Sequence, residues 1–201
     1  MKKAVNILVL TLAVLAMLAL GACGQEAAPK AEETLYPVSL DGTEVRVGET
    51  TLQALLDKGL EVTVSDENYE QIVVDPTQML EANAYYSGGS VWISDSVFAH
   101  ISFVTEEEAV PMGEAVIARL EFSMALEEDP NVLGAIAFDG TPVTEWTREL
   151  AGERFPDWTG DENMWLKYGL EYSYDLNFTP EGKLMKFAVE RKYDVDWTGE
   201  D

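Results

Sequence analysis

The sequence predicts an α+β fold, in which an antiparallel, curved β-sheet has its apolar face covered by two short helices. Long segments alternate apolar and polar residues, a pattern that indicates antiparallel strands with one buried face. A short helical pattern precedes such strands in each half of the chain. Because each half combines the same kinds of element, the order also fits two tandem degenerate helix-plus-sheet repeats.

The first half, residues 35–126, begins with short strands and a helix. Residues 36–47 predict two short strands around an Asp-Gly turn. Thr50 and Gln53 form a capping-box pattern, and Gly59 suits a helix end in the left-handed conformation, so a helix is expected between them. Strands are expected to dominate the rest of this half, with the clearest alternation at 97–103 and 116–124.

The second half, residues 133–201, opens like the first. An acidic segment at 126–132, with a proline and no periodicity, marks the boundary between the halves. Residues 136–141 (Ile-Ala-Phe-Asp-Gly-Thr) then echo residues 38–43 (Val-Ser-Leu-Asp-Gly-Thr). A helical pattern follows, formed by Val143, Trp146 and Leu150. An internal duplication and a coincidence of two Asp-Gly turns both fit this echo, because Asp-Gly is common in turns. In element order alone, the chain resembles a β-lactamase-inhibitor-like layout of two small helix-plus-sheet units side by side.

A long β-hairpin is expected at the end of the chain. Alternating apolar residues from 166 to 178 predict one antiparallel strand with a single buried face. After a turn at 179–182, the apolar set of the return strand consists of Met185, Phe187, Val189 and Tyr193. Pairing Leu176 with Met185 and Tyr174 with Phe187 places both apolar sets on the same face of the hairpin.

The charge of the chain excludes one class of partner. The sequence has 13 basic and 37 acidic residues, which gives a formal net charge of -24. Nucleic acid is excluded, because its binding depends on Lys and Arg side chains that neutralise phosphates. Cationic ligands, basic proteins and divalent ions are compatible with this charge, although acidic surfaces mostly serve solubility. Since Cys23 is the only cysteine, no disulfide is expected within the chain.

The most specific motif lies in the first 23 residues. Lys2 and Lys3 precede an almost unbroken apolar run over 4–20, a pattern typical of secretory signals. The run ends in Leu20-Gly21-Ala22-Cys23. This tetrapeptide resembles the lipobox of bacterial lipoprotein precursors, in which small residues precede a cysteine that receives diacylglycerol. The resemblance implies cleavage between Ala22 and Cys23, and a mature chain that carries acyl chains such as palmitate on Cys23.

The same resemblance implies a location. Residues 1–22 would be the signal peptide, and residues 23–34 would be the lipidated cysteine and a flexible tether without large apolar side chains. By coil statistics, about ten such residues reach roughly 15–20 Å. The folded part is therefore expected at the cell membrane, anchored through the lipid on Cys23 and facing outside the cytoplasm.

The sequence contains no catalytic constellation and implies no cofactor. The sole histidine, His100, lies within an alternating strand pattern, and no nucleophile motif accompanies it. A single histidine and a single cysteine also argue against a zinc site. Calcium needs only oxygen ligands, and its weak candidates are carboxylates of two Asp-Trp-Thr-Gly segments: Asp157, Asp161, Asp194 and Asp196.

These features favour a non-enzymatic binding or interaction domain for an unknown protein or small-molecule ligand. Tyr85, Tyr86 and Trp92 are the candidate binding residues, because aromatic side chains offer flat contact surfaces. The alternation pattern equally allows them to belong to the sheet core. The alternative is a carboxylate-dependent hydrolase acting on cell-envelope polymers. A deep cleft with two facing carboxylates would favour the hydrolase, whereas a broad concave sheet without a pocket would favour binding.

Overall fold

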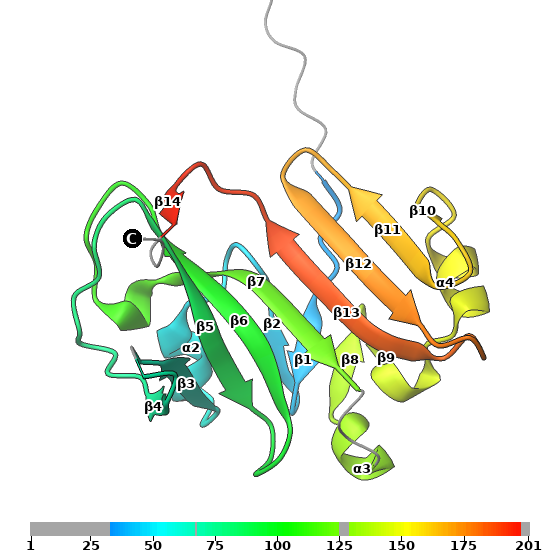
Figure 1. The fold of residues 1–201 in the computed structure, drawn as a ribbon, viewed down its shortest axis with the longest axis horizontal. Coiled ribbons are helices and arrows are strands. Elements are labelled where there is room, and N and C mark those ends of the chain that lie inside the picture. Colours follow the sequence, from blue (N-terminus) through cyan, green and yellow to red (C-terminus); the bar gives the residue numbers. More distant parts are fainter. Residues whose placement is uncertain (1–32, 67, 125–128, 198–201) are drawn as a thin grey trace, which may run out of the picture. The chain divides into compact units, whose positions relative to one another are not determined.

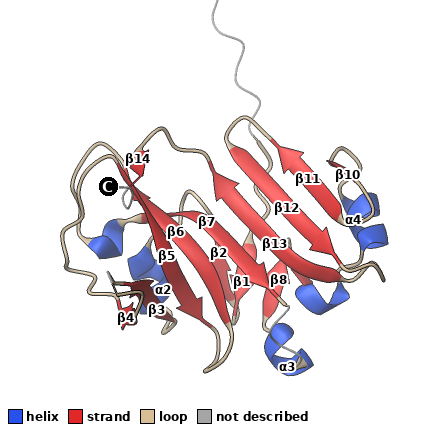
Figure 2. Ribbon diagram, in the orientation of Figure 1, coloured by secondary structure: helices blue, strands red, loops and turns tan. Residues whose placement is uncertain are grey.

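The computed structural model describes residues 33–66, 68–124 and 129–197. The chain divides into a unit of residues 1–32 and a compact unit that begins at Glu33. The predicted signal peptide and lipobox lie outside the described residues. The compact unit is mostly antiparallel β-sheet with a few short helices, and its sheets are open and curved (Figures 1 and 2). The predicted α+β class is therefore confirmed.

One large sheet contains strands from both halves of the chain. Their spatial order is β10-β11-β12-β13-β7-β6-β5-β3-β4, and β14 (Asp196–Trp197) pairs in parallel with β5. The first half contributes β3 (Glu61–Ser65), β4 (Gln71–Val73), β5 (Ala84–Trp92), β6 (Phe98–Thr105) and β7 (Val116–Ser123). The second half contributes β10 (Thr159–Gly160), β11 (Met164–Tyr168), β12 (Tyr172–Phe178) and β13 (Leu184–Arg191). The halves meet where β7 lies antiparallel to β13, with Glu121 opposite Ala188.

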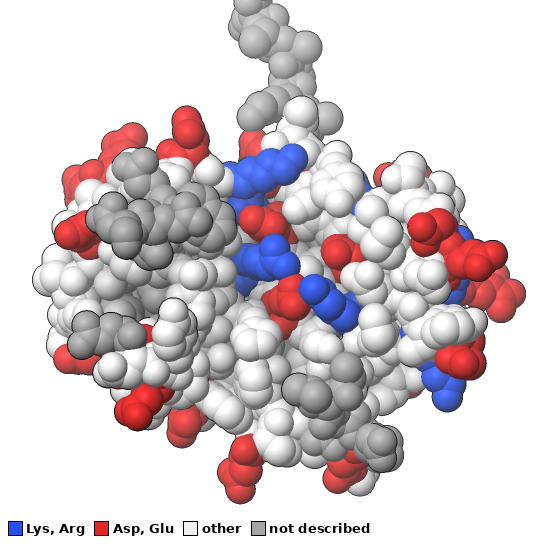
Figure 3. All heavy atoms as spheres, in the orientation of Figure 1, with Lys and Arg blue, Asp and Glu red and all other residues white. Residues whose placement is uncertain are grey.

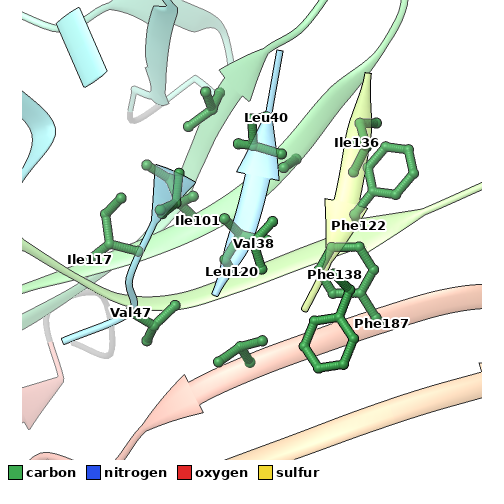
Figure 4. Packing of buried hydrophobic residues seen from close by; sticks show 14 of the residues in the cluster. Val38, Leu40, Val47, Ile101, Ile117, Leu120, Phe122, Ile136, Phe138 and Phe187 are labelled. Atoms are coloured by element: carbon green, nitrogen blue, oxygen red, sulfur yellow. The ribbon is translucent and has the colours of Figure 1, made fainter. Parts of the chain in front are cut away.

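A smaller sheet packs on one face of the large sheet. Its order is β2-β1-β8-β9, and its strands are β1 (Val38–Leu40), β2 (Thr43–Val45), β8 (Ile136–Phe138) and β9 (Thr141–Pro142). The helices are α2 (Leu52–Asp57), α3 (Pro130–Leu133) and α4 (Arg148–Arg154). Figure 4 shows the core between the two sheets, where Val38 and Phe138 of the small sheet lie near Leu120 and Phe187 of the large one. Buried residues of α2 and α4 belong to the same core.

The two Asp-Gly turns of the sequence occupy equivalent places. Asp41 and Gly42 have φ of 47° and 75°, and Asp139 and Gly140 have φ of 46° and 73°. Positive φ at both central residues is typical of type I′ hairpin turns. Each turn closes a short hairpin, β1–β2 or β8–β9, and the first strands of the two hairpins pair with each other.

The starts of the two helices correspond as well. Thr51 accepts a hydrogen bond from the N–H of Ala54 (3.2 Å), and Thr147 accepts one from the N–H of Leu150 (3.1 Å). In each half, two backbone hydrogen bonds join the helix start to the beginning of the strand at the junction of the halves. For β7 they run from Leu52 N to Ala115 O and from Ile117 N to Thr50 O. For β13 they run from Arg148 N to Gly182 O and from Leu184 N to Trp146 O. The large sheet has the corresponding mirrored order, because β7, β6 and β5 on one side match β13, β12 and β11 on the other. The two halves, here called repeats, therefore have matching turns, helix caps and strand order, and they share one core and one sheet.

The predicted C-terminal hairpin needs two corrections. Residues 166–178 do not form one strand, because β11 ends at Tyr168 and a turn leaves Leu170 exposed before β12 begins. The predicted pairings of Leu176 with Met185 and of Tyr174 with Phe187 are also wrong, because Leu176 lies opposite Phe187 and Tyr174 lies opposite Val189. A register irregularity at Asn177/Phe178 places Leu184 in the core and leaves Met185 40% exposed.

Two helix predictions are corrected in detail. The first helix is capped by Thr51, since the hydroxyl of Thr50 accepts a hydrogen bond from the N–H of Arg46 (2.9 Å). In the second half, Val143 and Trp146 are buried but precede α4 in a 3₁₀ turn and an extended residue. Their spacing matches a helix because each turns inward toward the core, and not because they share a helical face.

The predicted tether extends two residues too far. The carboxylate of Glu33 accepts hydrogen bonds from the backbone N–H groups of Leu170, Glu171 and Tyr172. The hydroxyl of Tyr174 donates to the carbonyl of Thr34 (3.3 Å). Glu33 and Thr34 therefore belong to the folded unit, and a fragment that begins at residue 35 would lack these contacts.

Candidate functional site

The candidate site is the face of the large sheet that points away from the small sheet, here called the open face. Strand residues that alternate with the core residues form it, among them Trp92, His100, Arg119, Glu121, Asp175, Lys186 and Glu190. In the described residues, the segment around Tyr193 and Val195 covers part of this face beside β5. The rest presents side chains from both repeats.

An ion-pair network occupies the middle of the open face. Arg119 Nη2 lies 2.5 Å from Glu121 Oε2, and Arg119 Nη1 lies 3.2 Å from Glu190 Oε2. Lys186 Nζ lies 2.9 Å from the same oxygen of Glu121. Figure 3 shows basic and acidic side chains side by side over β7, β13 and β12, at the junction of the repeats. Arg119 and Lys186 come from neighbouring strands of different repeats, so the network joins the two halves.

The network shifts the pKa values of two of its members, Glu121 and Arg119. Burial raises the pKa of Glu121, but hydrogen bonds and charge from Lys186 and Arg119 outweigh burial and lower it. Burial lowers the pKa of Arg119, and the nearby Glu121 and Glu190 raise it above its usual value. Glu121 and Arg119 therefore stay ionised and paired, since charge-assisted hydrogen bonds are stronger than neutral ones.

Asp175 is a carboxyl group of the open face whose pKa is raised. Burial raises its pKa, while Lys186 and the amide of Asn177, which donates to Asp175 Oδ1 (2.6 Å), act against that rise. Asp175 and Glu190 line one cavity of about 130 Å³, together with Arg119, Tyr168, Ser173, Tyr174 and Ala188. This volume is well below the roughly 300–1,000 Å³ of pockets that hold small-molecule ligands.

An aromatic group lies on the open face of the first repeat. The rings of Trp92 and Phe98 are 4.7 Å apart, and His100 meets Phe98 edge-on at 4.9 Å. Trp92 Nε1 donates to Thr63 Oγ1 (3.0 Å), which fixes the indole ring. Beside it runs a groove of about 440 Å³ lined by Gly59, Glu61, Trp92, Ile93, Ser94 and Asp95. The exposed imidazole of His100 is therefore part of this aromatic surface.

The structure separates the three predicted aromatic binding residues. Tyr85 is 4% exposed and packs with Val104 and Ala118 beneath the segment at 193–195. Tyr86 points toward the core, where it stacks on Phe103 at 5.4 Å. Trp92 alone of the three lines a groove on the open face. The three side chains therefore do not form one flat patch.

The predicted calcium candidates do not form one site, and two of them make other polar contacts. Asp161 Oδ1 accepts hydrogen bonds from the N–H groups of Asn163 and Met164, and Asp157 lies 3.9 Å from Lys167 Nζ. Asp194 is exposed, and the side chain of Asp196 lies outside the described atoms. Among the described residues, no group of three or more His, Cys, Asp or Glu side chains could hold a metal ion.

The charged centre of the open face was absent from the sequence-based candidates. The alternation that places Leu120 and Phe122 in the core also places Arg119 and Glu121 on the other face. That signal was available, but it does not reveal that β13 is the neighbour of β7. The network became visible only once the two repeats were joined.

Comparison with protein-family models, with curated proteins and with solved structures finds no match for this chain. The likeness in element order to the β-lactamase-inhibitor-like layout therefore stays an analogy. In the ranges that the structure describes, no helix combines the length and apolar character needed to cross a membrane.

Proposed function

We propose that this chain is a membrane-tethered lipoprotein that faces outside the cytoplasm and binds a partner through its open face without catalysing a reaction. The motif Leu20-Gly21-Ala22-Cys23 supports the anchoring. The observation that carries the binding role is the open face itself, a broad sheet surface with paired charges at its centre and aromatic rings at its side.

The chemistry of this face suits a polypeptide surface better than a small ligand. Its central cavity is only about 130 Å³, and the larger groove beside Trp92 lies at one side of the sheet. Aromatic side chains and arginine are both enriched at protein interfaces, and this face presents both. The proposed ligand is therefore a protein or peptide that lies across the strands.

Site-specific photo-cross-linking in the native envelope tests the binding role. A photoreactive phenylalanine analogue at His100 places the probe on the open face, and the same analogue at Glu153, an exposed residue of α4, is the matched control. We expect a discrete protein adduct from position 100 that disappears when Arg119→Glu disrupts the network. Equal adducts from both positions, or adducts that survive Arg119→Glu, would contradict the proposal.

Metabolic labelling with radioactive palmitate tests the anchoring separately. The wild-type chain is expected to incorporate label and to fractionate with membranes, because two or more acyl chains hold a protein stably on a bilayer. Cys23→Ala is expected to remove the label. Label that persists in this variant, or a wild type without label, would refute the lipoprotein assignment.

A carboxylate-dependent hydrolase of envelope polymers is the second candidate. One observation favours it: Asp175, whose pKa is raised chiefly by burial, shares a cavity with a second carboxylate, Glu190, which pairs with Arg119. The small volume of that cavity argues against it. Purified cell-wall glycan is the test substrate, and hydrolysis that is lost in both Asp175→Asn and Glu190→Gln would replace the binding proposal with the enzyme.

A further inference from the structure

The turn between β11 and β12 exposes two large side chains. Tyr168 is 73% exposed and Leu170 is 75% exposed, on either side of Gly169. They are neighbours in the chain, and neighbouring exposed apolar groups often mark an interaction site. The segment 168–171 is here called the hairpin tip.

The described chain begins at this same place. The N–H groups of Leu170, Glu171 and Tyr172 converge on the carboxylate of Glu33, and a Cβ atom on Gly169 would collide with that carboxylate. Burial acts to raise the pKa of Glu33, but these N–H groups and the charge of Lys167 lower it, so the group stays ionised. Glu33 thus holds the beginning of the folded unit against the hairpin tip (Figure 1).

Basic residues gather at the same end of the molecule. Lys192 Nζ donates to the carbonyl of Gly169 (2.7 Å), and Arg191 lies beside Tyr193, with its guanidinium 5.0 Å from the ring centre. Figure 3 shows Lys and Arg side chains at this end, whereas most of the charged side chains along the rest of the rim are acidic. In a chain with a net charge of -24, these basic side chains weaken the repulsion between this end and an anionic surface.

The chain length limits how far the hairpin tip can lie from Cys23. Nine residues separate Cys23 from Glu33, and even fully extended they span at most about 35 Å. A compact unit of this size is about 40 Å across. If Cys23 carries a lipid, Glu33 and the hairpin tip lie within about 35 Å of the bilayer, which is less than the width of the domain.

We infer that the hairpin tip rests on the lipid bilayer, with Tyr168 and Leu170 entering the interfacial region and Lys192 facing the headgroups. This inference depends on the proposed lipidation of Cys23. Tyrosine rings are favoured at the membrane interface, and basic side chains pair with lipid phosphates. Two side chains are too few to hold a protein on a membrane, but beside a lipid anchor they orient the domain. The open face then has a set direction relative to the membrane.

Fluorescence quenching by labelled lipids tests the inference on the full mature protein. Leu170→Cys carries a thiol-reactive, environment-sensitive fluorophore, and the protein is reconstituted into vesicles of phosphatidylethanolamine and phosphatidylglycerol that contain nitroxide-labelled lipid. Tyr69→Cys is the matched control, because Tyr69 is 90% exposed and precedes β4 at the other edge of the sheet. We expect loss of most of the fluorescence at residue 170 and none at residue 69, and equal quenching at both would overturn the inference.

A second pair of variants separates contact from mere proximity. In the Leu170→Cys background, Tyr168→Asp is expected to reduce the quenching substantially, whereas Tyr69→Asp leaves it unchanged. If Tyr168→Asp has no effect, the tip is near the bilayer without resting on it, and the inference fails. The wild-type protein monitors the underlying proposal, because an unlipidated Cys23 would itself take up the fluorophore.

Discussion

Loss of the two equivalent helix caps is expected to cost the same free energy and to act on one transition. Thr51→Ala removes the acceptor of the Ala54 N–H, and Thr147→Ala removes the acceptor of the Leu150 N–H. An N-cap threonine contributes typically about 1 kcal/mol to the free energy of unfolding. For a domain of this size, that corresponds to a loss of roughly 2–4 °C in Tm per substitution. The sites are in different repeats, so the double variant is expected to lose about 2 kcal/mol.

Thermal unfolding followed by circular dichroism and by tryptophan fluorescence provides the assay. Four of the five tryptophans lie in the second half of the chain, so fluorescence reports mainly on the second repeat. Because both repeats share one core, Thr51→Ala in the first repeat should shift the fluorescence transition as much as the circular dichroism transition. Thr144→Ala, at an exposed threonine that caps neither α-helix, is the control. Two separate transitions, with each cap variant moving only one, would refute the shared-core reasoning.

Four further outcomes follow from the structure. Glu33→Gln should lower stability at neutral pH, and the difference should vanish as the pH falls through the lowered pKa of Glu33, because that carboxylate stabilises the fold only when ionised; urea titrations across acidic pH measure this. Asp175→Asn should raise stability at neutral pH, and the gain should shrink in acid, where the wild-type carboxyl with its raised pKa becomes protonated. The same urea titrations measure this, and a loss of stability at neutral pH would contradict it. Phe138→Ala should cost about 3–5 kcal/mol, because its fully buried ring packs against several other aromatic rings, and Phe138→Leu should cost clearly less in parallel melts. Calcium should not raise Tm beyond sodium chloride of equal ionic strength, since a site occupied at 100 times its Kd would add about 2.7 kcal/mol; a calcium-specific rise that Asp157→Ala abolishes would contradict this.

Local pattern was a good guide to the individual elements of this fold. Alternation at 97–103 and 116–124 corresponds to β6 and β7, and both Asp-Gly turns are hairpin turns. Threonine caps begin both helices, one residue after the predicted start in the first case. These features depend on interactions within a few residues, such as the side-chain hydrogen bond of a cap, so the sequence carries their signal directly.

The candidate site was less accessible to prediction. Of the aromatic candidates only Trp92 reaches the open face, because the segment around Tyr193, about a hundred residues away in the chain, covers Tyr85. The period of two tells which residues of a strand share a face, but not which face another layer covers. The same limit hid the network of Arg119 and Glu190.

The sequence by itself determined the class of the fold, the two similar openings, the acidic surface and the lipobox-like motif, because composition, short motifs and local periodicity express these features. Only the tertiary structure decided that β7 and β13 adjoin, that β1 pairs with β8, and that Glu33 binds backbone groups 137–139 residues away. Strand order depends on which apolar faces pack against each other. The binding of Glu33 depends on backbone N–H groups that are free to donate at a turn distant in the sequence. No local pattern encodes these pairings, because the alternation within a strand is the same whichever strand lies beside it.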